Sequence, residues 1–422
     1  MLRPVGGQVL AVVVFVGVWS SATAAQETPP PAASVQLQAG TPTGISVESE
    51  QKLRAAFEQL YNLEFESAGA LFEQVAAEEP ESATVRAFWA SALLYEILAY
   101  QGTLQSQLFV TSNEFLRQPH LPPGPELDQR FHRVNQEAQK RAEARLEKNP
   151  QDIDGLFALG LVYGTQANYL AGVKAEYFRG LRIGEKAYKL HKRLRKLRPE
   201  VHDAAVVLGI RDYILGSLRL RQRFLLFFLG ARGNRERGLK YLEEAATQGE
   251  FLRTYAQILL VVAHIRAEHL KQALSLAEDL RARYPRNPII LVEVAKLYRR
   301  VQRYPEAARA SRDLLAELIA HPHNPRLLGP EAALLELGLV EAAQGDLARA
   351  LETLDRVGGI PDASPHVQAQ ALLERGKIFD RLGEREKALA EYEKVINLAV
   401  DIKFTRPALN YREQPYQADE KK

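Results

Sequence analysis

The sequence predicts an all-α protein built from antiparallel helical hairpins, and three observations support this fold class. Apolar residues recur three or four positions apart through most of residues 49–402. Small residues return at regular places within paired segments, which allows two packed helices to approach each other closely. Clusters such as Pro285–Pro288 then end the segments, because proline cannot continue a helix.

Composition limits the class of protein more than it limits the partner. The 422 residues are 46% hydrophobic, enough for two or three cores or for one continuous repeat array. The 55 basic and 52 acidic residues leave a net charge of +3, so any strongly charged surface must be local. Cysteine is absent, which excludes disulfides, thiol nucleophiles, cysteine-bound metals and lipid-modified cysteine.

Residues 1–25 have the pattern of a cleaved secretory signal peptide. Arg3 precedes the apolar run Val9–Trp19, and small residues follow at positions 20–25. A retained membrane anchor is the alternative, but about 11 apolar residues are too few for a bilayer that needs about 20. We therefore expect an exported protein in the periplasm or associated with the cell envelope, with a flexible Pro/Ala/Thr-rich leader at 26–47.

The N-terminal part, residues 48–252, should form hairpins with insertions. A first repeat at 49–82 places Phe65, Ala68 and Phe72 at second-helix spacing. Helices are expected at 83–100 and 130–148, separated by an insertion at 102–128. Long insertions are often functional, and a disordered loop is the alternative.

Two further hairpins follow, and then the register becomes regular. The hairpin at 154–199 carries Gly160 and Ala187 as its small residues, and the next carries Gly209 and Gly238. A regular array is predicted for 253–402, with a polar, unstructured tail at 403–422. Its four units, at 254–287, 288–321, 331–364 and 369–402, place a small residue at Ala273, Ala307, Ala350 and Ala388. These four units should stack without a break.

These landmarks resemble those of the tetratricopeptide repeat (TPR) family over nearly all of the mature chain. The stretch from Gly160 to Pro288 is similar to a bacterial subtype of exported TPR proteins with no assigned chemistry. The resemblance implies a right-handed helical solenoid that holds other proteins. A TPR unit separates its small residues by about 12 positions. Here the separations are 27 and 29, so two central hairpins are over-long.

In a TPR solenoid the first helix of each repeat lines a concave groove that holds a peptide or a partner protein. The alternative for such residues is burial by the chain's own insertions. The corresponding positions are mostly apolar, which argues against a site for a peptide's terminal carboxylate. The candidate contacts are Val206, Ile210, Tyr213, Ile258, Val262, Ile265, Lys296, Arg299 and Arg300.

Two other segments are candidates for external contacts. Residues 179–198 hold nine Lys or Arg against one Glu; the alternatives are a solvated helix face, an anionic membrane, an acidic partner or, least expected, nucleic acid. The run Phe224–Leu229 is apolar on every face of a helix. Phe224, Phe227 and Phe228 are therefore candidates for contact with a partner or a membrane surface, with internal packing as the alternative.

No catalytic motif stands out. The sequence has no HExxH metal site, no GxSxG nucleophile elbow and no phosphate-binding glycine loop. We therefore expect a non-enzymatic interaction scaffold of the bacterial cell envelope, without metal, cofactor or nucleic-acid partner. The competing hypothesis is an enzyme subunit or assembly factor in envelope or polysaccharide biogenesis, with its site in the 102–128 insertion.

Overall fold

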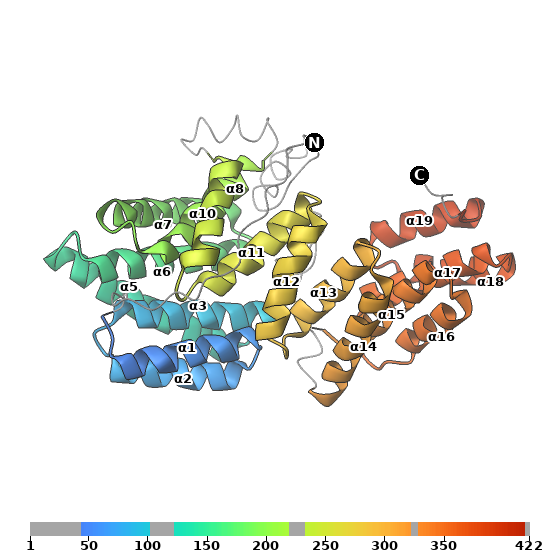
Figure 1. Cartoon of the computed structure of the whole chain (residues 1–422), viewed down its shortest axis with the longest axis horizontal. Helices are drawn as coiled ribbons and strands as arrows, with labels where there is room; N and C mark the ends of the chain where they lie inside the picture. The colour runs from blue at the N-terminus through green and yellow to red at the C-terminus, as the bar shows by residue number, and fades with distance from the viewer. Residues whose placement is uncertain (1–43, 102–121, 219–232, 322–327, 418–422) are drawn as a thin grey trace, which may run out of the picture. The chain divides into compact units, whose positions relative to one another are not determined.

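The computed structural model describes residues 44–101, 122–218, 233–321 and 328–417, and the regular elements in these ranges are all helices (Figure 1). The all-α fold class is therefore confirmed. The chain divides into two compact units, Met1–Ala267 and Glu268–Lys422. The predicted signal peptide, nearly all of the leader, most of the 102–128 insertion and the run Phe224–Leu229 lie outside the described residues.

The first unit consists of helices whose boundaries follow the predicted segments closely. They are α1 (Val47–Tyr61), α2 (Phe65–Glu78), α3 (Ala83–Tyr100), α5 (Pro125–Lys148), α6 (Ile153–Gly172), α7 (Tyr177–Leu197), the short 3-10 helix η4 (His202–Ala204), α8 (Ala205–Gly216), α10 (Arg235–Gln248) and α11 (Arg253–Arg266). One boundary differs from the prediction. Residues 125–128, assigned to the insertion, form the first turn of α5, because Pro125 fits the first position of a helix.

Most hairpins share one turn geometry. A single residue with positive φ lies between the paired helices in five of the described turns. These residues are Leu63, Ala175, Gln302, Gly345 and Gly383. Because one left-handed residue reverses the chain within three or four positions, the same tight connection recurs along the chain. This recurrence marks the hairpin as the repeated unit.

The hairpin of α6 and α7 is over-long as predicted. Its helices have 20 and 21 residues and pack closely along their length. A Cβ atom added to Gly180 would lie 2.9 Å from the carbonyl oxygen of Ala167, so this crossing needs glycine. The extra length of this hairpin therefore lies in its helices.

The next hairpin gains its length differently. Its helices are short, since α8 has 12 residues and α10 has 14. The two helices already meet at their connected ends, where a Cβ atom on Gly216 would lie 2.2 Å from the backbone nitrogen of Arg235. The extra residues thus lie in the connection 217–234, most of which is outside the described ranges.

The second unit contains the regular repeats. Its helices are α12 (Leu270–Arg283), α13 (Pro288–Arg300), α14 (Tyr304–Ala320), α15 (Pro330–Gln344), α16 (Leu347–Gly358), α17 (Pro365–Arg381), α18 (Arg385–Leu398) and α19 (Ile402–Glu413). The predicted alanines Ala273, Ala307, Ala350 and Ala388 are all fully buried. The predicted unit 254–287 is divided, since α11 belongs to the first unit and α12 to the second.

The expected unstructured tail contains helix α19. Phe404 and Ala408 are buried on this helix and pack with Tyr392 and Val395 of α18. The helix covers apolar side chains at the end of the array that would otherwise face water, which is the usual role of a terminal capping element. Phe404 and Ala408, the two buried residues of α19, lie in a mostly polar segment whose periodicity was too weak to predict the helix.

Replacing Ala350 with tryptophan should lower the free energy of unfolding by about 2 kcal/mol, because α16 has no space at this crossing. Ala348 lies exposed on the same helix, so Ala348→Trp is the matched control and should unfold like the unchanged protein. Urea unfolding followed by circular dichroism measures both. Equal stability of the two variants would show that the repeat register is misassigned.

Candidate functional site

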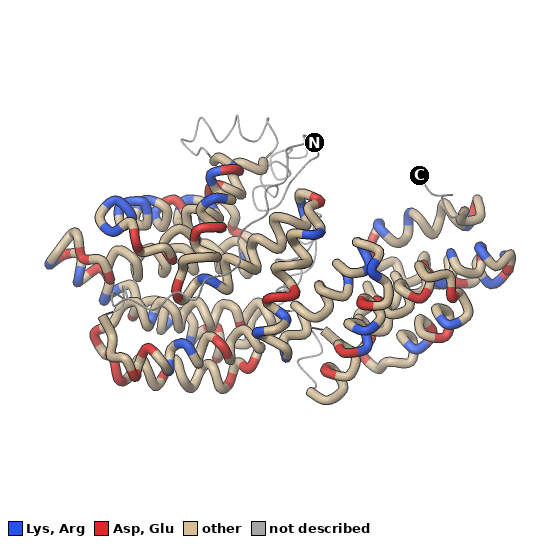
Figure 2. The backbone as a smooth tube through the Cα atoms, in the orientation of Figure 1, with Lys and Arg blue, Asp and Glu red and all other residues tan. Residues whose placement is uncertain are grey.

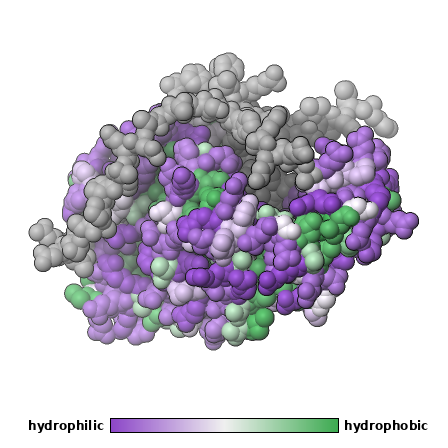
Figure 3. Space-filling view, turned by 45° about the vertical axis from the view of Figure 1, so that its right-hand side comes forward, coloured by the Kyte–Doolittle hydropathy of each residue, from purple (hydrophilic) through white to green (hydrophobic). Residues whose placement is uncertain are grey.

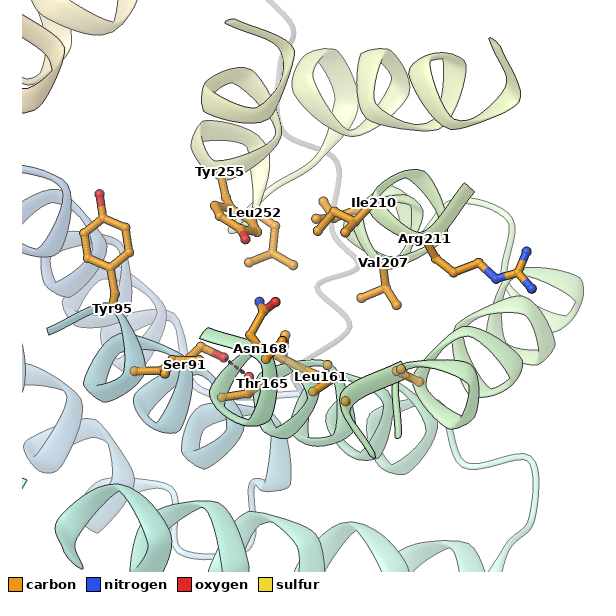
Figure 4. A pocket seen from close by; sticks show the side chains of 18 of the residues that line it. Ser91, Tyr95, Leu161, Thr165, Asn168, Val207, Ile210, Arg211, Leu252 and Tyr255 are labelled. Carbon is orange, nitrogen blue, oxygen red and sulfur yellow. Dashed lines mark hydrogen bonds between the residues drawn. The ribbon is translucent and has the colours of Figure 1, made fainter. Parts of the chain in front are cut away.

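A cavity of about 250 Å³ lies within the first unit. Its walls come from α1, α3, α6, α7, α8 and the start of α11, helices that are far apart in the sequence. In Figure 4, Leu161 and Asn168 rise from α6, while Leu252 and Tyr255 face them from the start of α11. The lining is mainly aliphatic and aromatic, as in pockets that take apolar groups.

Small residues of the long hairpin create this space. Gly164, Ala167 and Ala171 on α6 and Gly180 and Gly184 on α7 all line the cavity. Larger side chains in this space would fill it, and at Gly164 a Cβ atom can be added without a clash. A Cβ atom on Gly164 would meet only a methyl group of Val207, at 3.9 Å.

The polar groups in the wall are few, and several are hydrogen bonded to each other. The hydroxyl oxygens of Ser91 and Thr165 are 2.8 Å apart, and the Ser91 hydroxyl also donates to the carbonyl of Ala87 at 2.9 Å. Burial raises the pKa of Tyr95 and of Tyr255, although a hydrogen bond from Asn168 opposes the shift at Tyr255. Both phenols therefore stay neutral and can orient a bound polar group.

Among the described residues Arg211 is the one basic side chain in the lining, and carboxylates of the chain itself neutralise it. Arg211 donates to Glu185 at 2.7 Å and to the fully buried Asp212 at 3.0 Å, and it stacks over Tyr188 at 4.3 Å. Arg237 on α10 also donates to Asp212, at 2.5 Å. This network joins α7, α8 and α10 and fixes one wall of the cavity, so Arg211 is a structural residue there.

The predicted apolar contacts mostly pack inside the first unit. Val206, Tyr213, Ile258, Val262 and Ile265 are buried. Within this set Val206 lines the cavity, as does the half-buried Ile210 from the same predicted group. Contact of these residues with a partner stays a prediction.

The predicted cations lie on α13 in the second unit and pair with carboxylates there. Lys296 is 3.9 Å from Glu293, and Arg299 is 3.0 Å from the buried Glu336 on α15. Arg300 pairs with Glu268 at 2.7 Å. These pairings reduce the charge that the three side chains offer to a partner. Phe224, Phe227 and Phe228 lie outside the described residues.

His191 holds an unusual position beside the cavity hairpin. It is fully buried, its ring stacks on Phe157 at 5.4 Å with the planes 4° apart, and its Nε2 is 3.1 Å from the Phe157 carbonyl oxygen. Burial lowers its pKa to about 4, so the ring is neutral at pH 7. In three other hairpins the same position, four residues after the small residue, holds Leu242, Leu354 or Tyr392, whereas α12 and α14 place Ala277 and Ser311 there. A histidine at a position where three other hairpins place leucine or tyrosine is the sequence signal that could have identified His191.

Two properties of the described residues bear on function. No group of three or more His, Asp or Glu side chains in this part of the chain is placed to hold a metal ion. None of the described helices combines the length and apolar character needed to cross a membrane. On the face shown in Figure 3 the visible surface is mainly hydrophilic, and hydrophobic residues gather in a few separate areas.

No protein-family model matches the chain, and no curated protein matches it. Among solved structures, yeast Tom70 is 12% identical over 86% of this chain and 88% of that chain, with a TM-score of 0.38. The human IFIT1 dimer with m7Gppp-AAAA is 14% identical over 88% and 86%, with a TM-score of 0.41. A tetratricopeptide repeat protein from Parabacteroides merdae is 15% identical over 77% and 98%, with a TM-score of 0.29.

The chain's own repeats define the class of protein. In each of two regular hairpins the glycine of the first helix lies against the second helix. A Cβ atom added to Gly338 would lie 2.6 Å from Leu354, and one added to Gly376 would lie 2.4 Å from Tyr392. Close approach of paired helices at small residues is what the sequence predicted. The molecule is an all-α protein built of repeated helical hairpins, the fold class that the sequence predicted.

Proposed function

We propose that the chain is a non-enzymatic binding protein that holds an apolar segment of a partner protein in the cavity of the first unit. The observation that carries the proposal is the cavity itself, which combines an apolar lining with few polar groups. Its arginine is already paired, and Ser91 and Thr165 are bonded to each other. Such a site favours burial of apolar side chains over acid–base or nucleophilic chemistry.

The location that best fits this function is the bacterial cell envelope. This part of the proposal rests on the N-terminal sequence pattern of Arg3, Val9–Trp19 and the small residues at 20–25. The alternative of an enzyme subunit or assembly factor keeps its candidate site in the insertion, where residues 102–121 lie outside the described part.

Filling the cavity should abolish partner binding without loss of stability. Gly164→Leu places a side chain in the space, and the backbone there is ordinary helix with room for Cβ. Replacing a helical glycine should itself stabilise the free protein by about 0.5–1 kcal/mol. The matched control is Gly69→Leu on α2, where an added Cβ meets nothing within 4 Å.

Photo-crosslinking from the cavity wall measures the effect. A photoreactive phenylalanine analogue at the exposed Asn168 should capture a defined protein in cells. We expect this adduct to persist with Gly69→Leu and to disappear with Gly164→Leu. An adduct of equal yield in both variants, or no adduct from Asn168, would contradict binding in the cavity.

A further inference from the structure

Helix α7 carries a straight row of cations on its outer face. Arg182, Lys186, Lys189, Arg193 and Lys196 follow one another at spacings of four, three, four and three residues, and all are exposed. Lys192 lies beside this row and is exposed as well. At 3.6 residues per turn the six side chains fall within an arc of roughly 120°. We call these six residues the α7 basic row.

The opposite face of the helix is fixed in the fold. Gly180, Ala187, His191 and Leu194 are its buried residues, and they point into the hairpin with α6. The basic row therefore cannot turn inward, and Figure 2 shows Lys and Arg gathered along α7.

The row keeps its charge. None of its six members makes an ion pair within the part of the chain that the structure describes, although Lys186 and Lys192 lie over Tyr163 and Tyr188. The other three basic residues of the segment differ, because each has a carboxylate partner. Arg179 pairs with Glu176, Arg195 with Glu244 and Arg198 with Glu200. The single acidic residue of the segment, Glu185, is occupied by Arg211.

We propose that the α7 basic row docks the protein on the surface of an anionic lipid membrane. A straight row on an exposed helix can touch a plane with all of its cations at once, and headgroup phosphates supply the opposite charge. The row is about 20 Å long, at 1.5 Å per residue from Arg182 to Lys196.

An exposed aromatic residue favours the membrane over a soluble polyanion. Phe178 is 54% exposed and lies one turn before Arg182, in the middle of the arc that the cations occupy. A phenylalanine among cations is typical of helices that lie in the interface of a bilayer, where its ring enters the acyl boundary. An acidic protein or a nucleic acid offers the cations no comparable apolar layer. None of the six residues lines the cavity, so the proposal is independent of it.

Vesicle flotation with the full chain tests the proposal. The protein should float with vesicles of phosphatidylcholine containing about one third phosphatidylglycerol and stay behind with pure phosphatidylcholine. Each cation removed should weaken binding about fivefold, so Lys189→Gln, Arg193→Gln and Lys196→Gln together should weaken it about 100-fold. Phe178→Ser should weaken vesicle binding roughly threefold and leave binding to soluble polyglutamate unchanged.

The matched control removes the same charge from another exposed helix. Arg133→Gln, Lys140→Gln and Lys148→Gln lie on α5, which also carries five acidic residues, and should keep vesicle binding. Residues 1–43 are the same in both triple variants. Any insertion of these residues into the vesicles therefore contributes equally to the flotation of both variants. Equal flotation of the two variants would overturn the proposal. Binding to polyglutamate or single-stranded RNA without flotation would also overturn it, and would assign the row to an acidic protein or a nucleic acid.

Discussion

Replacing Gly160 with leucine is expected to destabilise the first unit by about 3 kcal/mol. A Cβ atom on Gly160 would lie 2.1 Å from Cδ2 and 2.4 Å from Nε2 of His191. The ring cannot move away easily, because it is fully buried and stacked on Phe157. Thermal unfolding should show a loss in Tm on the order of 10 °C.

The same helix offers the control for this variant. Gly164 lies one turn further along α6 with room for a side chain, so Gly164→Ala should be neutral or slightly stabilising. A second variant separates the clash from a simple loss of helix packing. Adding His191→Ala to Gly160→Ala should recover part of the stability that Gly160→Ala loses alone. Unfolding of Gly160→Leu at the temperature of the unchanged protein would refute the contact with His191.

Lowering the pH from 7 to 4 is expected to remove about 3 kcal/mol of stability through His191 alone. Burial lowers its pKa from 6.5 to about 4 in the folded protein, whereas the unfolded chain keeps the ordinary value. Below pH 6.5 the unfolded state thus binds more protons than the folded state. Stability must fall with pH through this window, by at most about 1.4 kcal/mol per unit.

The variant His191→Leu isolates this effect from the carboxylates that titrate at similar pH. Leucine occupies the same repeat position at Leu242 and Leu354, so it suits this helix contact. We expect the difference in unfolding free energy between the two proteins to change steeply between pH 6.5 and 4, because only one of them can protonate the site. A constant difference across that range, measured by urea titrations, would refute a neutral buried histidine.

The sequence was most informative where the structural signal is local. Helix periodicity, hairpin ends and the small residue of each repeat depend on neighbours a few positions apart, and Ala307 and Ala388 are buried as their spacing predicted. The over-long hairpin of α6 and α7 followed from the same landmarks, since Gly160 and Ala187 lie 27 positions apart.

The cavity and the charge pairs could not be predicted in this way, because they depend on which helices become neighbours in space. Val206 and Ile210 were chosen as groove residues from their helix alone, yet the space that they line also needs Tyr95 and Tyr255 from distant helices. Arg299 was expected to face a partner, but its carboxylate, Glu336, is 37 positions away. Repeat spacing identifies the helices, but only the packing of these helices decides which side chains remain available to contact a partner.

The close approach of Gly216 and Arg235 affects where the length of the chain can change during evolution. Because the two ends of the connection 217–234 already meet, α8 and α10 need only a turn of a few residues to form a complete hairpin. The cost of closing a loop rises only slowly with its length, so residues can be gained or lost here without disturbing the helices on either side. Natural variants of this protein should therefore differ in length first in the connection 217–234, whereas Gly216, where α8 meets α10, should be retained.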